Sequence, residues 1–222
     1  YFAIIFDTAS RIRPPESLED LAKPEYAKKI ILMDPRTSTP GTGFLAWTIA
    51  VYGKSYLDYW ARIKGNILTL APSWDSGYGL FTSGEAPLVI SYTTSPAYHL
   101  ETEKSTRYRA CLLYTSRRYH LETEKSTRYR ALVFAEGHPA QIEGLGLVKG
   151  ARNPTAAKAF IDFMLTDEAQ SVLPLTQWMY PVSKTVNLPE SFRAAPAVTK
   201  TLKVEPSAVA AAIDPAIAVL SR

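Results

Sequence analysis

Cysteine and histidine are scarce in this chain, which has one cysteine and three histidines among its 222 residues. The cysteine, Cys111, lies in a segment that we interpret below as an insertion, so the remainder of the chain contains none. A remainder without cysteine excludes thiolate metal sites and catalytic cysteines there. It is compatible with an oxidising compartment but does not require one.

Long apolar runs are also absent, since none approaches the roughly 18 to 20 residues of a membrane-spanning helix. Apolar residues nevertheless make up 46% of the chain, which is enough to form one sizeable core or two small ones. The chain opens at Tyr1 with neither an initiator methionine nor a charged leader. We expect that the N-terminus is cut off, so the lack of a leader indicates nothing about the compartment.

An exact repeat is the strongest internal pattern. The sequence YHLETEKSTRYRA occupies positions 98–110 and recurs at positions 119–131. Structural repeats normally consist of several diverged units of about 20 to 50 residues, and one perfect copy does not have that form. Because CLLYTS at positions 111–116 also resembles translated sequencing adapter, we interpret residues 111–131 as an insertion or duplication artefact. A recent tandem duplication is the alternative, and sequencing the locus separates the two.

A strong basic charge is missing once that segment is set aside. Residues 111–131 contain five basic and two acidic side chains, so their removal changes 25 basic and 21 acidic residues to 20 and 19. The net charge then falls from +4 to +1. The sequence therefore gives no support to a nucleic-acid-binding surface.

Predicted strands and helices alternate along the chain, a pattern that favours a parallel sheet covered by helices. The short apolar run at residues 87–90 is typical of a strand that is buried on both faces. Asn153 is the predicted cap of a helix with apolar residues at helical spacing. We predict strands at 2–6, 29–33, 67–71, 87–90, 132–135 and 141–148, and helices at 17–21, 40–52, 55–63, 154–165, 167–173 and 207–220.

Polar loops follow two of the predicted buried strands. In DPRTSTPGTG, residues 34–43, Ser38 or Thr39 can cap a helix, and the glycines would allow a ligand to approach the backbone. It is not a nucleotide-binding P-loop, because no lysine followed by serine or threonine comes after the glycines. Residues 92–95 combine a tyrosine with three hydroxyls before Pro96. Since parallel strands end at one edge of a sheet, both loops predict a ligand site there. The alternative is that Ser95 only caps a helix and Tyr92 packs in the core.

Aromatic residues recur in the predicted loops, at Trp74, Tyr92, Trp178 and Tyr180. Such rings stack on flat heterocycles and attract cations, and each contact of this kind contributes about 0.5 to 2 kcal/mol to binding. A flat cationic ligand would fit this set. For any one of these rings, ordinary packing is the alternative.

Four motifs in order carry a resemblance to a known family: DPRTSTPGTG, the W-x3-YGLF pattern at residues 74–81, SYTTSPAYH at 91–99 and WMYPV at 178–182. They closely resemble the periplasmic thiamine-binding proteins of bacterial ABC importers, over nearly all of the chain except the insertion. The resemblance implies an α/β fold like the type II periplasmic binding proteins, with a parallel-sheet lobe flanked by helices. Residues 1–222 would then form mostly the second lobe with hinge strands and part of the C-terminal region, and we expect the first lobe to precede Tyr1.

The resemblance also implies a function. Thiamine or its phosphates would be held between two lobes and delivered to the permease subunits of an ABC transporter at the inner membrane. The protein would be periplasmic and monomeric, without a metal, a resident cofactor, a nucleic-acid partner or catalytic residues. The motifs imply a role for each candidate site residue. Polar contacts would come from Ser38 and Thr39, and an aromatic wall from Trp74. The turn around the ligand would be Tyr92, Thr93, Thr94 and Ser95, and a further aromatic contact would come from Trp178.

Two other classes stay open. A binding protein of the same fold could take ferric iron, a polyamine or a phosphorylated small molecule, although Tyr92 and Tyr98 are not adjacent as paired iron ligands would be. A hydrolase could use Ser95, Asp75 and either His99 or His138. The chain has no G-x-S-x-G motif, and nothing in the sequence fixes a base beside a nucleophile, so we do not favour an enzyme.

Overall fold

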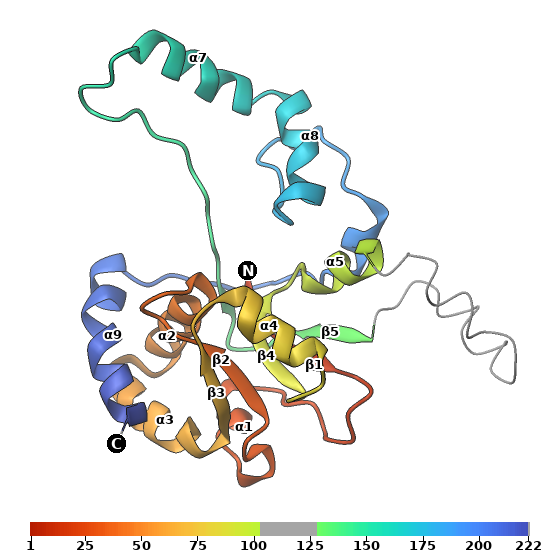
Figure 1. Ribbon diagram of the computed structural model, residues 1–222, viewed down its shortest axis with the longest axis vertical. Helices are drawn as coiled ribbons and strands as arrows, with labels where there is room; N and C mark the ends of the chain where they lie inside the picture. Colours follow the sequence, from red (N-terminus) through yellow and green to blue (C-terminus); the bar gives the residue numbers. More distant parts are fainter. Residues whose placement is uncertain (103–127, 222) are drawn as a thin grey trace, which may run out of the picture. The chain divides into compact units, whose positions relative to one another are not determined.

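The computed structural model describes residues 1–102 and 128–221, and these form two compact units (Figure 1). Unit 1 comprises Tyr1–Ser95, Thr127–Gln141 and Ala195–Arg222, and unit 2 comprises Pro96–Ser126 and Ile142–Ala194. The described elements of unit 1 are β1 (Phe2–Asp7), α1 (Leu18–Leu21), β2 (Ile30–Met33), α2 (Thr39–Tyr52), α3 (Tyr56–Ile63), β3 (Ile67–Ala71), α4 (Trp74–Thr82), β4 (Leu88–Tyr92), β5 (Tyr129–Leu132), β6 (His138–Pro139), β7 (Thr201–Leu202) and α9 (Pro206–Ser221), with short 3-10 turns at Pro24–Tyr26, Gly53–Ser55 and Lys64–Asn66. Those of unit 2 are α5 (Ser95–Thr102), which begins at the last residue of unit 1, α7 (Pro154–Met164), α8 (Asp167–Thr176) and a 3-10 turn at Glu190–Ala194.

The main sheet of unit 1 has the strand order β3-β2-β4-β1-β5. Strand β2 pairs in parallel with both β3 and β4, whereas β1 pairs antiparallel with both β4 and β5. The parallel part follows the prediction, because a crossover helix between successive strands returns the chain in the same direction. The antiparallel β1 and β5 depart from the expected parallel sheet, and they make the sheet mixed. The predicted α/β fold is confirmed.

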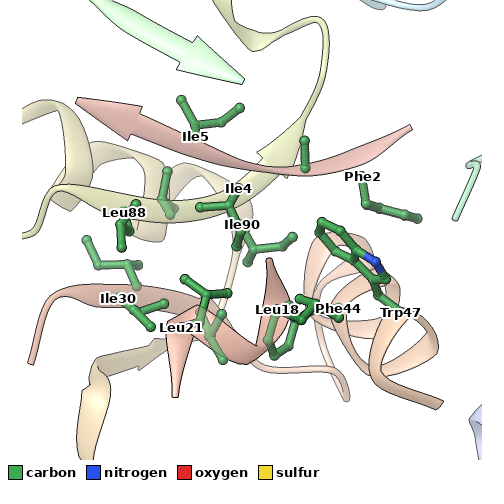
Figure 2. Packing of buried hydrophobic residues seen from close by; sticks show 14 of the residues in the cluster. Phe2, Ile4, Ile5, Leu18, Leu21, Ile30, Phe44, Trp47, Leu88 and Ile90 are labelled. Atoms are coloured by element: carbon green, nitrogen blue, oxygen red, sulfur yellow. The ribbon is translucent and has the colours of Figure 1, made fainter. Parts of the chain in front are cut away.

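The core of unit 1 lies where the sheet meets α1 and α2. Every residue of β1 and β2 is buried, as are the first four residues of β4. Strands that are buried on both faces need no alternation of polar and apolar residues, and α2 and α4 both pack against this sheet. Figure 2 shows side chains of strands and helices converging in this core, among them Ile4, Ile30, Leu88 and Ile90 with Leu18, Leu21, Phe44 and Trp47.

Glycines in α2 allow this close packing. A Cβ atom added at Gly41 would lie 2.3 Å from the carbonyl oxygen of Met33, and one at Gly43 would lie 2.5 Å from the ring of Phe2. Both glycines therefore serve the contact between α2 and the sheet. The expectation that they allow a ligand to approach the backbone is thus not needed to explain them.

The chain after β5 differs from the prediction. The predicted strand at 141–148 is wrong, since that stretch is irregular and exposes apolar residues, including 87% of Ile142. It has no strand neighbour among the described residues, and a strand needs one for its backbone hydrogen bonds. Instead, His138–Pro139 forms β6, which pairs with β7, and β5 begins at Tyr129 rather than at residue 132.

The predicted insertion, residues 111–131, lies largely outside the described residues. Its last residues are described, and they are part of unit 1: Tyr129 and Ala131 in β5 are buried in the core. The sequence YRA stands both at positions 108–110 and at 129–131, within the two copies of the repeat. Deleting residues 103–123 therefore leaves the same sequence as deleting residues 111–131. The insertion itself stays a prediction.

Unit 2 contains the predicted helix after Asn153. The Asn153 side chain accepts a hydrogen bond from the backbone N–H of Ala156 at 3.0 Å, so the predicted cap is confirmed. Helix α7 has its apolar residues at helical spacing, yet none of its residues is buried by the described part of the chain. Phe160 is 56% exposed.

Candidate ligand site

Three loops leave the carboxyl ends of β2, β3 and β4, the parallel strands of unit 1. The first two lie side by side, because Asp34 N–H donates to the Ala71 carbonyl at 2.8 Å and Thr37 Oγ1 donates to the Pro72 carbonyl at 2.6 Å. Each loop leads into a helix, α2 or α4. This is the edge of a parallel sheet at which ligands usually bind.

An internal ion pair stiffens the first loop. The guanidinium of Arg36 donates to both carboxylate oxygens of the nearly buried Asp34 through Nε, and Nη2 donates to Oδ2 at 2.6 Å. The side-chain hydrogen bond from Arg36 lowers the pKa of Asp34. Asp34 therefore stays ionised at neutral pH, and its charge is balanced within its own loop.

Ser38 occupies the N-cap position of α2, but its side chain makes no capping hydrogen bond. The residue is 8% exposed, and its hydroxyl has no hydrogen-bond partner in the part of the chain that the structure describes. An unsatisfied buried hydroxyl costs free energy, so this oxygen at the N-terminus of α2 would gain from a hydrogen-bond partner. Thr39 is the first residue of the helix and is exposed.

Trp74 is the first residue of α4, which begins with a capping box formed by Ser73 and Ser76. The indole stacks on the ring of Tyr78, with centroids 4.7 Å apart and planes 16° apart. Its Nε1–H donates to the hydroxyl of Ser91 at 2.8 Å. Trp74 is therefore held by stacking and by a hydrogen bond, as an aromatic wall requires.

The predicted hydroxyl-rich turn is mostly buried. Ser95 Oγ lies 2.9 Å from Ser91 Oγ and accepts from the N–H of Tyr92 at 3.4 Å. The ring of Tyr92 packs on Phe2 at 5.3 Å, so this tyrosine contributes to packing as the alternative proposed. Thr93 and Thr94 are buried.

Ser91 is a residue of this site that the sequence reasoning missed. It falls between the predicted strand at 87–90 and the predicted turn at 92–95, yet its hydroxyl joins Trp74 to Ser95. A signal was present, because a serine directly follows the apolar residues 88–90 within the same strand. A polar side chain at such a position needs a hydrogen-bond partner, and here it has two.

Trp178 belongs to unit 2, and two features distinguish it. Its φ of 56° is in the left-handed region, which is strained for a residue other than glycine and is typical of ligand sites. Its ring meets that of Tyr98 edge-on, with centroids 5.2 Å apart and planes at 89°. Tyr98 was not among the predicted site residues. Because Trp178 and Trp74 are in different units, their joint contact with one ligand stays a prediction.

His138, one of the two histidines considered for hydrolysis, has both ring nitrogens engaged with the backbone. His138 Nε2 accepts from the N–H of Phe134 at 2.7 Å, so its Nδ1 carries the proton and donates to the Phe2 carbonyl at 2.8 Å. Burial lowers the pKa of His138, which keeps the ring neutral, and both of its nitrogens are occupied. Among the described residues, no group of three or more His, Cys, Asp or Glu side chains could hold a metal ion.

Comparisons with known proteins identify the family of this chain. The profile of the family described as "Bacterial extracellular solute-binding protein" matches residues 1–202. The chain belongs to this family. As a member, it is 42% identical over 212 residues to the thiamine-binding periplasmic protein of Brucella melitensis and 37% identical over 211 residues to that of Escherichia coli. Each match covers 95% of this solute-binding protein, and the predicted resemblance is confirmed.

Solved structures agree on the fold of this solute-binding protein. A periplasmic thiamin binding protein superposes with a TM-score of 0.81 and 35% identity, over 100% of this chain and 63% of that one. A ferric binding protein from Campylobacter jejuni superposes with a TM-score of 0.71 at 21% identity over 99% of this chain and 66% of that one, which shows the fold alone. This chain spans 57% of the length of the Brucella melitensis relative. No helix in the described residues has the length and apolar character needed to cross a membrane.

Proposed function

We propose that this chain is the ligand-binding part of a periplasmic protein that captures thiamine and delivers it to the permease of an ABC importer. The observation that carries the proposal is the fixed indole of Trp74 at the carboxyl edge of the parallel strands, close to hydroxyls that can take polar groups. Relatives named for thiamine binding, at 42% and 37% identity, support the choice of ligand.

The chemistry of thiamine matches these residues. Its two aromatic rings, one of them cationic, can stack on Trp74, and the quadrupole of an indole face attracts a cation. The unpartnered hydroxyl of Ser38 can bond a polar group of the ligand, and the N-terminus of α2 favours an anionic group such as a phosphate. Trp178 would supply a second aromatic contact, with Thr39 and residues 92–95 around the ligand.

The proposed activity is binding and release, without catalysis. Two lobes would close on thiamine by a hinge motion, and the closed form would dock on the permease. In this proposal thiamine is the cargo rather than a cofactor, and the protein works as a monomer without a metal or nucleic acid.

A chimera tests the proposal. This chain replaces the matched 57% of the Brucella melitensis relative, and calorimetry measures thiamine affinity. Trp74→Ala should weaken binding at least about tenfold, because it removes a stacking wall. Leu80→Ala, on the exposed face of the same helix, is the control and should not change affinity. An unchanged affinity for Trp74→Ala would remove Trp74 from the site.

Competition separates the remaining ligands of this fold. Ferric citrate, putrescine and a sugar phosphate are each added against bound thiamine in the same chimera. Thiamine should resist displacement by all three at equal concentration. Displacement by one of them, or no binding of thiamine at all, would contradict the proposed ligand.

A further inference from the structure

Three side chains of unit 1 form a short hydrogen-bonded chain beneath the proposed site. Trp74 Nε1 lies 2.8 Å from Ser91 Oγ, and Ser91 Oγ lies 2.9 Å from Ser95 Oγ. Ser91 is on β4 and is fully buried, whereas Ser95 is the first residue of α5 and is 6% exposed. The chain therefore runs from the aromatic wall, through the core, to the turn.

The direction of the first hydrogen bond is fixed by chemistry. The indole N–H can only donate, so the Ser91 hydroxyl accepts from Trp74. Two directions are open to the contact between the serines. If Ser95 donated to Ser91, the proton of Ser91 would have no acceptor among the described residues, inside a fully buried strand. Either direction leaves one hydroxyl proton without an acceptor in the described ranges, and this costs more at Ser91, which is fully buried, than at Ser95, which is 6% exposed. The favoured arrangement therefore has Ser91 donating to Ser95.

This direction leaves one proton unused. Ser95 Oγ accepts from Ser91 and from the N–H of Tyr92, which occupies both of its lone pairs. Its own O–H has no acceptor in the described ranges 1–102 and 128–221. The oxygen sits at the carboxyl end of β4 and the start of α5, which is the edge on which the other two loops of the site lie.

We infer that Ser91 is a positioning residue that directs a hydrogen-bond relay from Trp74 to Ser95 and leaves the Ser95 proton for a hydrogen-bond acceptor of the ligand. The inference rests on the proposed function and adds to it the chemical class of one ligand group. That group is a ring nitrogen, a hydroxyl oxygen or a phosphate oxygen. Ser91 itself touches no ligand in this arrangement.

The relay also couples the Trp74 indole to the Ser95 hydroxyl. Trp74 is held on one face by Tyr78 and at its edge by Ser91, so the rotation of the indole is restricted from two directions. Losing the Ser91 hydroxyl frees the indole edge and at the same time allows the Ser95 hydroxyl to turn. One substitution in the core should therefore weaken both an aromatic and a polar contact with the ligand.

The first experiment uses the unliganded chain. The indole N–H signals of its four tryptophans are recorded by nitrogen–proton NMR, and Trp74→Phe identifies the Trp74 signal. Ser91→Ala should shift that signal and accelerate its exchange with solvent. Ser95→Ala should shift it as well, through Ser91, although Ser95 does not touch the indole. Ser83→Ala, at the far end of α4, is the control and should leave it unchanged.

Two outcomes of this experiment overturn the relay. If Ser91→Ala leaves the Trp74 signal in place, the hydrogen bond does not hold the indole. If Ser91→Ala shifts the signal but Ser95→Ala does not, the serines are not coupled and the direction is wrong. Ser91→Thr keeps the hydroxyl on a strand that favours β-branched residues, and it should preserve the Trp74 signal. Loss of the signal in this variant would also contradict the inference.

The second experiment measures affinity in the chimera, for thiamine and for thiamine monophosphate. Ser91→Ala should weaken binding about tenfold, the size expected for a positioning hydrogen bond. Ser95→Ala should weaken it at least as much, and the loss in the double variant should be smaller than the sum of the two single losses, because the polar contact of Ser95 is weakened in both. A larger effect of Ser95→Ala on the phosphate form identifies a phosphate oxygen as the acceptor, and equal effects identify an acceptor on thiamine itself.

The two experiments fail separately. Additive losses in the double variant would overturn the relay while leaving thiamine binding in place. Absence of thiamine binding in the unsubstituted chimera would overturn the proposed function and the ligand acceptor with it. The NMR experiment would still decide whether Ser91 joins Trp74 to Ser95.

Discussion

The two units bury their apolar side chains to very different degrees. The sequence predicts both α2 in unit 1 and α7 in unit 2 as helices, from start signals and apolar residues. In α2, Phe44 and Trp47 are fully buried against the sheet, whereas α7 has no buried residue in the described part of the chain. Apolar spacing thus predicts that a helix forms and which face is apolar, but it does not predict what covers that face.

The same contrast holds for charge. In unit 1, the carboxylate of Asp7 is 7% exposed and receives two hydrogen bonds from Arg128, whereas the Glu190–Arg193 pair of unit 2 is largely exposed on both sides. Burial by itself raises the pKa of Asp7, but the hydrogen bonds from Arg128 and from the N–H of Ala9 outweigh it, so the pKa is lowered. The Asp7–Arg128 pair therefore holds a buried carboxylate, whereas the Glu190–Arg193 pair is open to solvent.

The largest expected effect compares one residue type in both units. Phe44→Ala should reduce the free energy of unfolding by about 3 to 5 kcal/mol, because it leaves a cavity in a closed core. Phe160→Ala should change it by less than about 0.5 kcal/mol, because that ring is already 56% exposed. Urea unfolding followed by circular dichroism measures both. Equal losses would show that α7 is covered as firmly as α2.

The next comparison concerns the ion pairs. Arg128→Ala should reduce the free energy of unfolding by about 2 kcal/mol, since it leaves the buried Asp7 carboxylate without its partner. Arg193→Ala should have an effect below about 0.5 kcal/mol, as is usual for an exposed pair. The same urea titrations at pH 7 decide this. A neutral result for Arg128→Ala would mean that Asp7 is solvated or paired otherwise.

A deletion tests the predicted insertion at residues 111–131. Cutting residues 103–123 keeps α5 up to Thr102 and restores the sequence before Tyr129, so every described element remains. We expect the free energy of unfolding to rise by about 1 kcal/mol, because a shorter connection is less costly to close. Thermal unfolding of the two chains gives the comparison. A deleted chain that fails to fold would show that the extra residues are structural.

The smallest effect is a pH dependence from His138 in unit 1. Because burial lowers its folded pKa below the unfolded value of 6.5, the unfolded state binds more protons below that pH. The contribution of His138 to the free energy of unfolding should be nearly constant above about pH 6.5. It should decrease as the pH falls below that value, by less than about 1 kcal/mol between pH 7 and pH 6. His138→Gln should abolish this part of the pH dependence. A wild-type stability that rises on acidification would contradict the neutral ring.

Several local features were predictable because neighbouring residues decide them. Ser17 caps α1 by accepting from Asp20 N–H, and Asn153 caps α7, as the sequence indicates. Residues 2–6 and 87–90 are so uniformly apolar that only buried strands suit them. The resemblance to thiamine-binding proteins was likewise carried by short contiguous motifs.

Other features depend on residues far apart in the chain. Ser91 has a role only because Trp74 lies across from it, and Gly41 is needed because α2 passes close to the carbonyl of Met33. The predicted strand at 141–148 failed for the same reason, since no strand in the described ranges lies beside it to accept its hydrogen bonds. The left-handed backbone of Trp178 has no signature in the surrounding residues.

The sequence by itself thus determined the helices, most of the strands, the family and the polar loops that follow the parallel strands, because capping, apolar spacing and short motifs act over a few residues. Only the tertiary structure decided that the sheet is mixed, that the Ser38 hydroxyl has no partner among the residues described and that Ser91 connects Trp74 to Ser95. Hydrogen bonds and packing contacts form between groups that folding brings within about 3 to 4 Å, whatever their separation along the chain.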